Sequence, residues 1–424
     1  MKLKLKRQDF IKAWQIAEKV AETKTTKEAT SGIFITASDD GQVILEATDL
    51  KTSVRCKAEG AEVIEPGFAL VPSVILGSMI KKSASEELDL EVTSERGFLK
   101  AANSSAKFSV ISAEEFPKIP ESSGAEEICS IMASDLAKLI SEGGSSASQP
   151  TDFPKYIGTC LLRTQNGYVK IVSTDGKRLS LSQFLCGNIS KDEDTLLPAP
   201  ALKELGKTLS LNYGGEEVKI LADGSTVWFN LENVEFSIRR IEASFPVYER
   251  ILNDTVKTSL KIKSSELIPV LERIDIIAKT TTAHIMAMFL NPNGELKITA
   301  RAPEKGTASE IINAEISGEV MNIGFNVNYF MDGLKVMGPD EVYIEFSDEE
   351  GQARMKRMKG DAVDQDLLYM LMPARLSAQD RIADDEMNEI NNTDAPEENQ
   401  NQNENWNEEN NNSEENHEGE NYQQ

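Results

Sequence analysis

The sequence predicts an α+β fold in which one structural unit occurs three times, over residues 1–125, 126–254 and 255–376. Three features recur in the same order in each segment. They are a short strand running into an amphipathic helix, a hairpin with a tight turn, and a second strand–helix pair followed by further strands. With 424 residues and 40% hydrophobic content, the chain is long enough for each unit to have its own core.

Each unit begins with an expected strand and helix, at residues 4–20, 129–143 and 259–279. In all three, a Ser, Asp or Gln accompanied by an acidic residue precedes the apolar period of a helix. This is the usual chemistry of a helix N-terminus. The pattern therefore predicts polar side-chain caps at the three helix starts.

A hairpin follows each helix, at residues 33–49, 160–175 and 286–301. Alternating apolar residues flank the turn sequences DDG, QNG and PNG, which occupy equivalent places. Further strand–helix pairs are expected at 68–82, 195–209 and 323–337, and each precedes more alternating runs. Three coincidences in the same register indicate one repeated domain.

Residues 377–424 differ from the rest because they are rich in Asn, Glu and Gln and contain almost no apolar residues. They hold 15 acidic residues against Arg381 alone, so about −14 of the formal net charge of −25 falls there and about −11 on the first 376 residues. The segment cannot bury enough apolar surface to offset chain entropy, so we predict a disordered tail. A solvated tail and an acidic interaction arm both fit this composition.

Catalytic and metal-binding patterns are scarce. The chain has two histidines, of which His284 lies in the apolar run HIMAMFL and is expected to be a structural strand residue. Walker, dinucleotide and GxSxG motifs are absent, and the acidic residues are scattered through turns. We therefore expect no metal, no cofactor and no enzymatic activity. A carboxylate-pair hydrolase remains the alternative from the enzyme class.

The cysteines contain no CxxC pair and are expected to be buried or half-buried thiols; they are Cys56, Cys129, Cys160 and Cys186. The N-terminus MKLKLKRQDF alternates Lys and Leu and has no apolar signal region. No apolar stretch approaches the length of a membrane span. These observations predict a cytoplasmic protein without a membrane partner.

Four stretches, in this order, resemble the bacterial DNA polymerase processivity factor, the β sliding clamp family. They are ATDL (47–50), STDGKRLSL (173–181), SFPVYERIL (244–252) and YMLMPARL (369–376). A TDG-x-R-L turn alone is a common hairpin, and without the family it indicates only a turn. The resemblance covers nearly all of residues 1–376.

The resemblance implies three DNA-clamp domains per chain and a head-to-tail homodimeric ring, with helices lining the pore and sheets outside. It implies double-stranded DNA as an encircled, non-specific partner, and the DNA polymerase III catalytic subunit, the clamp loader and other clamp-binding-motif proteins as further partners. A ring holds DNA by topology, so tight phosphate binding is unnecessary and an acidic body is compatible with it. The alternative is a peptide-binding scaffold of the same fold that never encircles DNA.

By the resemblance, basic residues on the inner helices and nearby loops contact DNA. The candidates are Lys12, Lys24, Lys27, Lys82, Lys138, Lys207 and Arg273, with Lys19, Lys81, Lys203 and Lys335 close to them. A solvated surface explains any single lysine equally well. At the subunit joint, Phe108, Ile276 and Ile277 stand where the family places apolar contacts, although core packing also explains them.

The resemblance further implies a pocket between the second and third domains for short peptides rich in Gln, Leu and Phe. Its expected wall comprises Ile157, Thr174, Gly176, Lys177, Arg178, Leu179, Pro246, Arg250, Ile251, Met370, Met372, Pro373, Ala374, Arg375 and Leu376. The Leu, Ile and Met side chains suit apolar anchors, and Met can repack around different partners. Arg178 and Arg250 are expected to hold polar or carboxylate groups of the peptide at the rim, and Gly176 to permit a tight turn.

Overall fold

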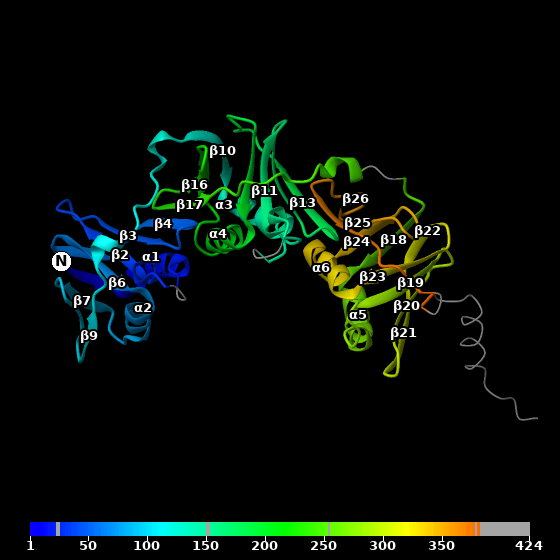
Figure 1. Cartoon of the computed structure of the whole chain (residues 1–424), viewed down its shortest axis with the longest axis horizontal. Helices are drawn as coiled ribbons and strands as arrows, with labels where there is room; N and C mark the ends of the chain where they lie inside the picture. Colours follow the sequence, from blue (N-terminus) through cyan, green and yellow to red (C-terminus); the bar gives the residue numbers. More distant parts are fainter. Residues whose placement is uncertain (23–25, 150–152, 253–254, 378–379, 382–424) are drawn as a thin grey trace, which may run out of the picture. The chain divides into compact units, whose positions relative to one another are not determined.

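The repeat predicted from the sequence is present in the computed structural model, which describes residues 1–22, 26–149, 153–252, 255–377 and 380–381. The predicted tail, 377–424, lies almost entirely outside the described residues. Residues 1–381 form one structural unit. Its six α-helices lie on one side of the strands, the lower side in Figure 1.

The first repeat contains nine strands and two α-helices, with a 3₁₀ turn, η1, after the first helix. The elements are β1 (Lys2–Lys6), α1 (Arg7–Val20), η1 (Glu28–Ser31), β2 (Gly32–Ala37), β3 (Val43–Thr48), β4 (Thr52–Lys57), β5 (Ala61–Glu65), β6 (Gly67–Pro72), α2 (Ser73–Lys82), β7 (Glu87–Val92), β8 (Arg96–Ala101) and β9 (Ser104–Ser109). A linker with η2 (Ala113–Glu115) and η3 (Ser122–Gly124) leads to the second repeat.

The second and third repeats follow the same plan. The second has β10 (Glu126–Met132), α3 (Ala133–Gly143), η4 (Lys155–Gly158), β11 (Thr159–Gln165), β12 (Tyr168–Thr174), β13 (Arg178–Leu185), β14 (Glu193–Pro198), α4 (Ala199–Asn212), β15 (Glu217–Ala222), β16 (Thr226–Asn230), β17 (Val234–Arg239) and η5 (Tyr248–Ile251). The third has β18 (Thr258–Lys263), α5 (Ser264–Ala278), β19 (Ile285–Asn291), β20 (Glu295–Ala302), β21 (Gly306–Asn313), β22 (Glu315–Gly318), β23 (Met321–Asn326), α6 (Val327–Met337), β24 (Glu341–Phe346), β25 (Ala353–Lys359), β26 (Ala362–Val363) and β27 (Leu367–Leu371).

Strands from neighbouring repeats join into shared sheets. One sheet runs β10-β15-β16-β17-β4-β3-β2-β6, so the second repeat continues into the first through β17 and β4. Another runs β14-β11-β12-β13-β27-β25-β24-β18-β22 and joins the second and third repeats through β13 and β27. We call the β4–β17 junction the first seam and the β13–β27 junction the second seam. Sheets β5-β1-β7-β8-β9 and β21-β20-β19-β23 complete the fold.

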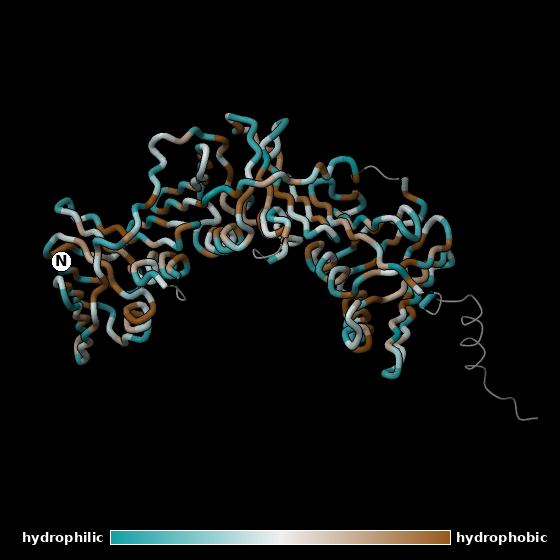
Figure 2. The backbone as a smooth tube through the Cα atoms, in the orientation of Figure 1, coloured by the Kyte–Doolittle hydropathy of each residue, from teal (hydrophilic) through white to brown (hydrophobic). Residues whose placement is uncertain are grey.

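The cores lie between the strands and the helix pairs α1/α2, α3/α4 and α5/α6. Trp14 and Phe10 on α1 are fully buried in the first repeat, and Phe325 and Phe330 are fully buried in the third. Figure 2 shows the hydrophilic positions gathered at the turns and the hydrophobic ones within the strands and helices. This arrangement is what the apolar periods predict.

The predicted side-chain caps are wrong at all three starts. The N-cap residues Lys6, Met132 and Lys263 make no side-chain cap hydrogen bond. Instead, the first helical N–H of each repeat donates to a backbone carbonyl from the loop before a later strand. The pairs are Arg7 N to Glu86 O (2.8 Å), Ala133 N to Glu216 O (2.8 Å) and Ser264 N to Asp340 O (3.0 Å). Because each helix follows its strand directly, tertiary contacts satisfy the free N–H groups.

The prediction that His284 lies in a strand is also wrong, because this residue comes just before β19. Its φ of 53° is left-handed, and its Nε2 is 3.8 Å from Oδ1 of Asp275. The four cysteines are free thiols and all are buried, within the range expected. Burial raises the pKa of Cys129 and of Cys160 to about 12, so these thiols are neutral.

Candidate functional site

The turn STDGKR joins β12 to β13 at the second seam. Oδ1 of Asp175 accepts hydrogen bonds from the backbone N–H groups of Lys177 (2.9 Å) and Arg178 (3.0 Å). The hydroxyl of Thr174 donates to the carbonyl of Arg178 (2.7 Å) and accepts from the N–H of Gly176 (3.0 Å). Gly176 has a φ of 85°, a left-handed conformation that glycine adopts at little cost.

The Arg178 guanidinium, which we expected to hold peptide groups at the rim, is paired within the chain. It contacts Oδ2 of Asp175 at 3.0 Å and Oδ2 of Asp332 on α6 at 2.6 Å. It also lies 4.3 Å from the ring centre of Tyr329 and donates to the Tyr369 hydroxyl. Burial lowers the pKa of Arg178, but Tyr369 and Asp332 outweigh this effect and the pKa is raised. Arg178 therefore fastens the second repeat to the third.

Beside the turn, apolar side chains cross the second seam on the face of the sheet opposite the helices. The register places them in a row, one from each neighbouring strand: Leu196, Leu161, Val172, Leu181 and Leu368. One step along the strands, Leu179 lies opposite Met370. Together with Tyr248, these residues form the outer cluster, and its members are buried or half-buried.

The linker after β17 covers the outer cluster. The N–H of Ile241 donates to the carbonyl of Leu196 (2.8 Å), and the ring of Phe245 meets that of Tyr248 edge to face. Arg163 pairs with Asp194 at 2.7 Å and with Glu249, and it lies over the Tyr248 ring. Burial raises the pKa of the Tyr248 hydroxyl, so this residue is a neutral part of the cluster.

The rest of the linker leaves predicted wall residues at the surface. Pro246 and Arg250 are exposed, and the Ile251 side chain is 42% exposed. The linker is tied to the third repeat by its carbonyls, since Arg354 donates to Leu252 O at 2.6 Å. Ile157 is buried in η4, beside β11 and β12, and is not part of the outer cluster.

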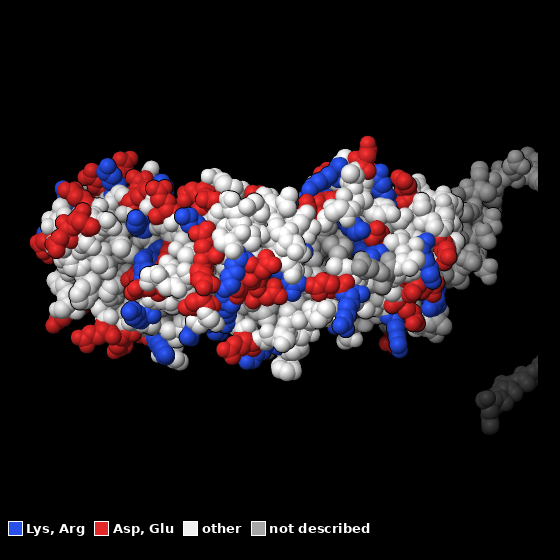
Figure 3. Space-filling view, turned by 90° about the horizontal axis from the view of Figure 1, so that it is seen from above, with Lys and Arg blue, Asp and Glu red and all other residues white. Residues whose placement is uncertain are grey.

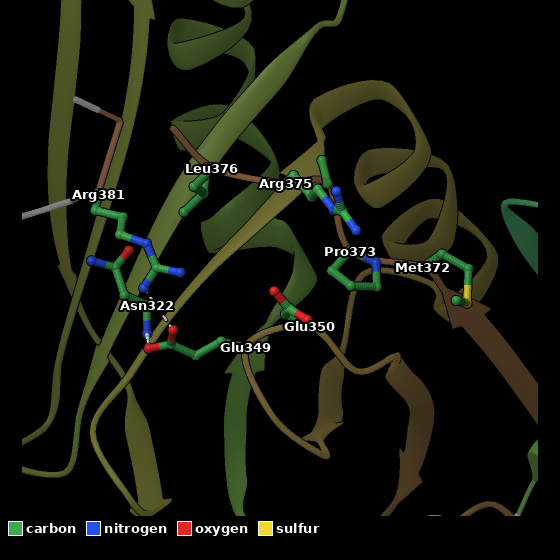
Figure 4. Close-up of a pocket in the computed structure, with 9 residues that line it drawn as sticks. Asn322, Glu349, Glu350, Met372, Pro373, Arg375, Leu376 and Arg381 are labelled. Atoms are coloured by element: carbon green, nitrogen blue, oxygen red, sulfur yellow. Dashed lines mark hydrogen bonds and ion pairs between the residues drawn. The ribbon is translucent and has the colours of Figure 1, made fainter. Parts of the chain in front are cut away.

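The segment Met372–Leu376 supplies the other predicted wall. The N–H of Met372 donates to the Lys177 carbonyl (2.8 Å), and that of Ala374 to the Gly324 carbonyl (2.8 Å), so the segment bridges two repeats. Met372 is 49% exposed. A cavity of about 460 Å³ is lined by Asn322, Glu349, Glu350, Met372, Pro373, Ala374, Arg375, Leu376 and Arg381. In Figure 4, Arg381 lies across this cavity from Pro373 and pairs with Glu349.

The structure thus places Leu179 opposite Met370 and Met372 beside Lys177, and it adds residues that the sequence did not indicate. The residues missed are Leu161, Val172, Leu181, Leu196, Phe245, Tyr248 and Leu368. Their signal was present at 160–162, 196–197 and 367–371, where apolar residues occupy both faces of a strand. Strands covered on both faces show this pattern.

Five of the predicted DNA-contacting residues lie on helices α1 to α5: Lys12, Lys82, Lys138, Lys207 and Arg273. Lys12, Lys27, Lys82, Lys138 and Lys207 are exposed, whereas Lys24 lies outside the described residues. Lys19, Lys203, Lys207 and Lys335 line a cavity of about 680 Å³ between α1, α3, α4 and α6.

Arg273 differs from the other predicted DNA-contacting residues, because its guanidinium forms two hydrogen bonds to Glu310 at 2.7 and 2.8 Å. The opposite face, viewed in Figure 3, carries acidic and basic side chains interspersed.

The predicted subunit contacts fall on the first and third repeats. Phe108 on β9 is 6% exposed, and its ring lies where a side chain at Gly97 would be. Ile276 on α5 is 57% exposed, and Ile277 is half-buried. β9 and β21 are both end strands of their sheets. Phe108 thus fills its own domain, and Ile276 has the exposure of a contact residue.

The described residues show neither a metal-binding cluster nor a membrane-spanning helix. Within the part of the chain that the structure describes, no group of three or more His, Cys, Asp or Glu side chains is placed to hold a metal ion. No described helix combines the length and the apolar character required to cross a membrane.

Comparison with known proteins places every repeat in one family. Residues 1–120, 130–247 and 249–374 match the family models of the N-terminal, central and C-terminal domains of the DNA polymerase III beta subunit. A beta sliding clamp of Pseudomonas aeruginosa is 28% identical over 378 residues, covering 89% of this chain and all of its own. One of Staphylococcus epidermidis is 25% identical, covering 88% of this chain and 99% of its own.

Solved structures agree. The crystal structure of a sliding clamp from Pseudomonas aeruginosa bound to griselimycin superposes with a TM-score of 0.81 at 26% identity, over 89% of this chain and all of that one. The clamp from Bacillus subtilis, at 22% identity, has the same TM-score and supports the fold. The predicted α+β fold of three clamp domains is confirmed. The chain belongs to the DNA polymerase III beta subunit family, the beta sliding clamps, which are non-catalytic processivity factors.

Proposed function

We propose that two copies of this chain close head to tail into a ring around double-stranded DNA and hold the DNA polymerase III catalytic subunit on its template. In this proposal, residues 1–125, 126–254 and 255–376 are the three clamp domains. The clamp loader and other proteins with clamp-binding motifs use the same peptide site. The protein works in the cytoplasm and requires no cofactor.

The observation that carries the peptide site is the apolar row across the second seam. Five aliphatic side chains lie side by side beneath the linker, on a face where an exposed sheet normally carries polar residues. The exposed Ile251 and Met372 extend this apolar surface beyond the linker. Adaptable aliphatic and methionine side chains suit Leu and Phe anchors from several partners.

The proposed ring is supported by the ends of the sheets. β9 and β21 are end strands in the first and third repeats, and an unpaired strand edge invites pairing with a second chain. Ile276 places an exposed aliphatic side chain in the third repeat. A closed head-to-tail arrangement of two chains removes both edges.

The proposed DNA contacts rest on the lysines of the helix side. Lys19 and Lys207 already have Glu204 nearby, at 2.9 and 3.8 Å, so this surface is only weakly basic. Weak contacts suit a ring that must slide, since each fixed phosphate contact has to break during movement.

Retention on circular DNA tests the proposal. Protein loaded by a clamp loader onto nicked circular plasmid should co-elute with it at salt that removes unloaded protein, and linearising the plasmid should release it. The exposed Ile251→Asp variant should remain on the circle but lose a fluorescent Gln/Leu/Phe peptide by at least about tenfold, or 1.4 kcal/mol. Leu185→Asp, which alters a 66% exposed residue at the end of β13, is the control. A stable monomer that never stays on circular DNA would favour the scaffold alternative.

A further inference from the structure

We propose that the first repeat carries a second peptide-binding surface, at the outer face of β2 and β6, that takes a segment with an aromatic or long aliphatic anchor and basic flanks. This surface is separate from the second-seam site and is more acidic. The proposal therefore goes beyond the function above and does not depend on it.

Three aromatic rings form the surface. Phe34 on β2 stacks on Phe68 of β6, with ring centres 5.9 Å apart, and on Phe116 of the linker, at 5.1 Å. The ring planes differ by only 17° and 19°. Phe68 is 66% exposed, whereas Phe34 and Phe116 are half-buried beneath it. A stacked aromatic platform at the surface is a ready contact for a further apolar side chain.

The outer edge of β6 beside this platform is partly covered by the chain itself. β6 is the end strand of its sheet, but Ile111 pairs with Leu70 on that edge (Ile111 N to Leu70 O, 3.0 Å), and η2 contacts β6 next to it. The exposed ring of Phe68, and not a free strand edge, is therefore the contact for an anchor side chain.

The repeat supports this interpretation. In the second repeat, Leu161 and Leu196 take the places of Phe34 and Leu70, and Ile241 donates to Leu196 as Ile111 does to Leu70. That equivalent surface belongs to the outer cluster. The first repeat presents the same backbone with larger, aromatic and more exposed side chains.

Charge decides which partner fits. Glu114 and Glu115 are exposed in the turn that leads into Phe116, and Glu65 is exposed shortly before Phe68. The nearby Lys118 lies 3.8 Å from Glu121. In Figure 3, an uncharged area over the first repeat has both acidic and basic side chains around it. A segment with Lys or Arg beside its anchor is therefore favoured.

The second-seam site has a mixed rim. Lys177, Arg250 and Arg375 are exposed there, but so are Glu249, Glu349 and Glu350, so basic flanks are less strongly favoured than at the first repeat. A partner with a segment for each surface could engage one chain at two places, and the gain would come from effective concentration.

Fluorescence anisotropy with two labelled seven-residue peptides tests the proposal. Both carry a central Trp, one with Lys flanks and the other with Glu flanks. We expect the Lys peptide to bind the full-length protein at least about tenfold more tightly than the Glu peptide at low salt. Phe68→Ser should weaken the Lys peptide by at least about tenfold, and Glu114→Gln with Glu115→Gln by about threefold.

Ile251→Asp, at the second-seam site, should leave the Lys peptide unaffected and serves as the matched control. Equal affinity for the two peptides, or loss of binding in Ile251→Asp but not in Phe68→Ser, would overturn the proposal. So would a Phe68→Ser effect confined to self-association in sedimentation, which would assign the surface to a second copy of the chain.

Discussion

The two seams have the same backbone pairing but different side chains on the face opposite the helices. At the first seam, Ser53 on β4 lies opposite Ser237 on β17. At the same place in the second seam, Leu179 on β13 lies opposite Met370 on β27. The Ser53 hydroxyl is 2.8 Å from that of Thr48, so the first seam is polar where the second is apolar.

The next pair along the strands repeats the contrast. Arg55 lies opposite Glu235 at the first seam and forms ion pairs with Glu46 (2.9 Å) and Glu235 (3.0 Å). The second seam has Leu181 opposite Leu368. Both seams pair five residues of each strand, but only the second has apolar side chains at both pairs on the face opposite the helices. The difference teaches that the same backbone joint accepts polar or apolar side chains, and under the proposed function only the apolar seam takes a peptide.

Transferring the first seam's charge to the second should have the largest effect. Leu181→Arg would place a charge where the side chain is 7% exposed, and we expect a loss of about 3 kcal/mol in the free energy of unfolding. Peptide binding at the second seam should fall below detection.

Adding Leu368→Glu should recover at least about 1 kcal/mol of stability, because the register reproduces the pairing of Arg55 with Glu235, without restoring peptide binding. Urea denaturation and anisotropy measure the two quantities. A double variant no more stable than Leu181→Arg would contradict the equivalence of the seams.

The reverse change at the first seam should have a smaller effect. Arg55→Leu leaves Glu46 and Glu235 without their cation, and because these groups are partly exposed, we expect a loss of about 1–2 kcal/mol. The triple variant Glu46→Val, Arg55→Leu, Glu235→Leu copies the second seam and should regain most of it. Thermal unfolding compares the variants, with Lys57→Leu, at an exposed site on the same strand, as the control.

The two seam turns should show the smallest difference. Asp49 and Thr48 make the same hydrogen bonds as Asp175 and Thr174, but the left-handed position holds Leu50, with a φ of 72°, where the second turn has Gly176. Gly176→Leu should cost about 1 kcal/mol and Leu50→Gly should change stability by less than that, because strain relief and unfolded-chain entropy oppose each other. Equal and opposite shifts in the unfolding midpoint would show that entropy is unimportant here.

The sequence predicted the repeats well because their signals are local. The turns QNG and PNG and the apolar periods fix hairpins and helices without knowledge of distant partners. The seams were not predictable from the residues, since the pairing of β13 with β27 joins segments far apart in the chain. For the same reason, Arg178 was expected at a peptide rim, whereas Asp332 and Tyr329 meet it from another repeat.

The failed cap prediction has the same physical origin. Polar side chains near the helix starts do not cap the helices. The first N–H of each helix instead donates to the backbone carbonyl of Glu86, Glu216 or Asp340. Tertiary structure thus overrode a local rule. The outer cluster was not predicted from the sequence for a different reason. Periodicity marks apolar positions, but it cannot tell which of two apolar faces of a strand packs against the helices.

The contacts with the carbonyls of Glu86, Glu216 and Asp340 join the first helix of each repeat to residues about 80 positions later in the chain. The first N–H of this helix has its acceptor only after the second half of the same repeat has been synthesised and has packed beside the helix. During translation, each half-made repeat should therefore keep a frayed leading helix until its second half emerges, and domain fragments cut at the midpoint of a repeat should fail to refold.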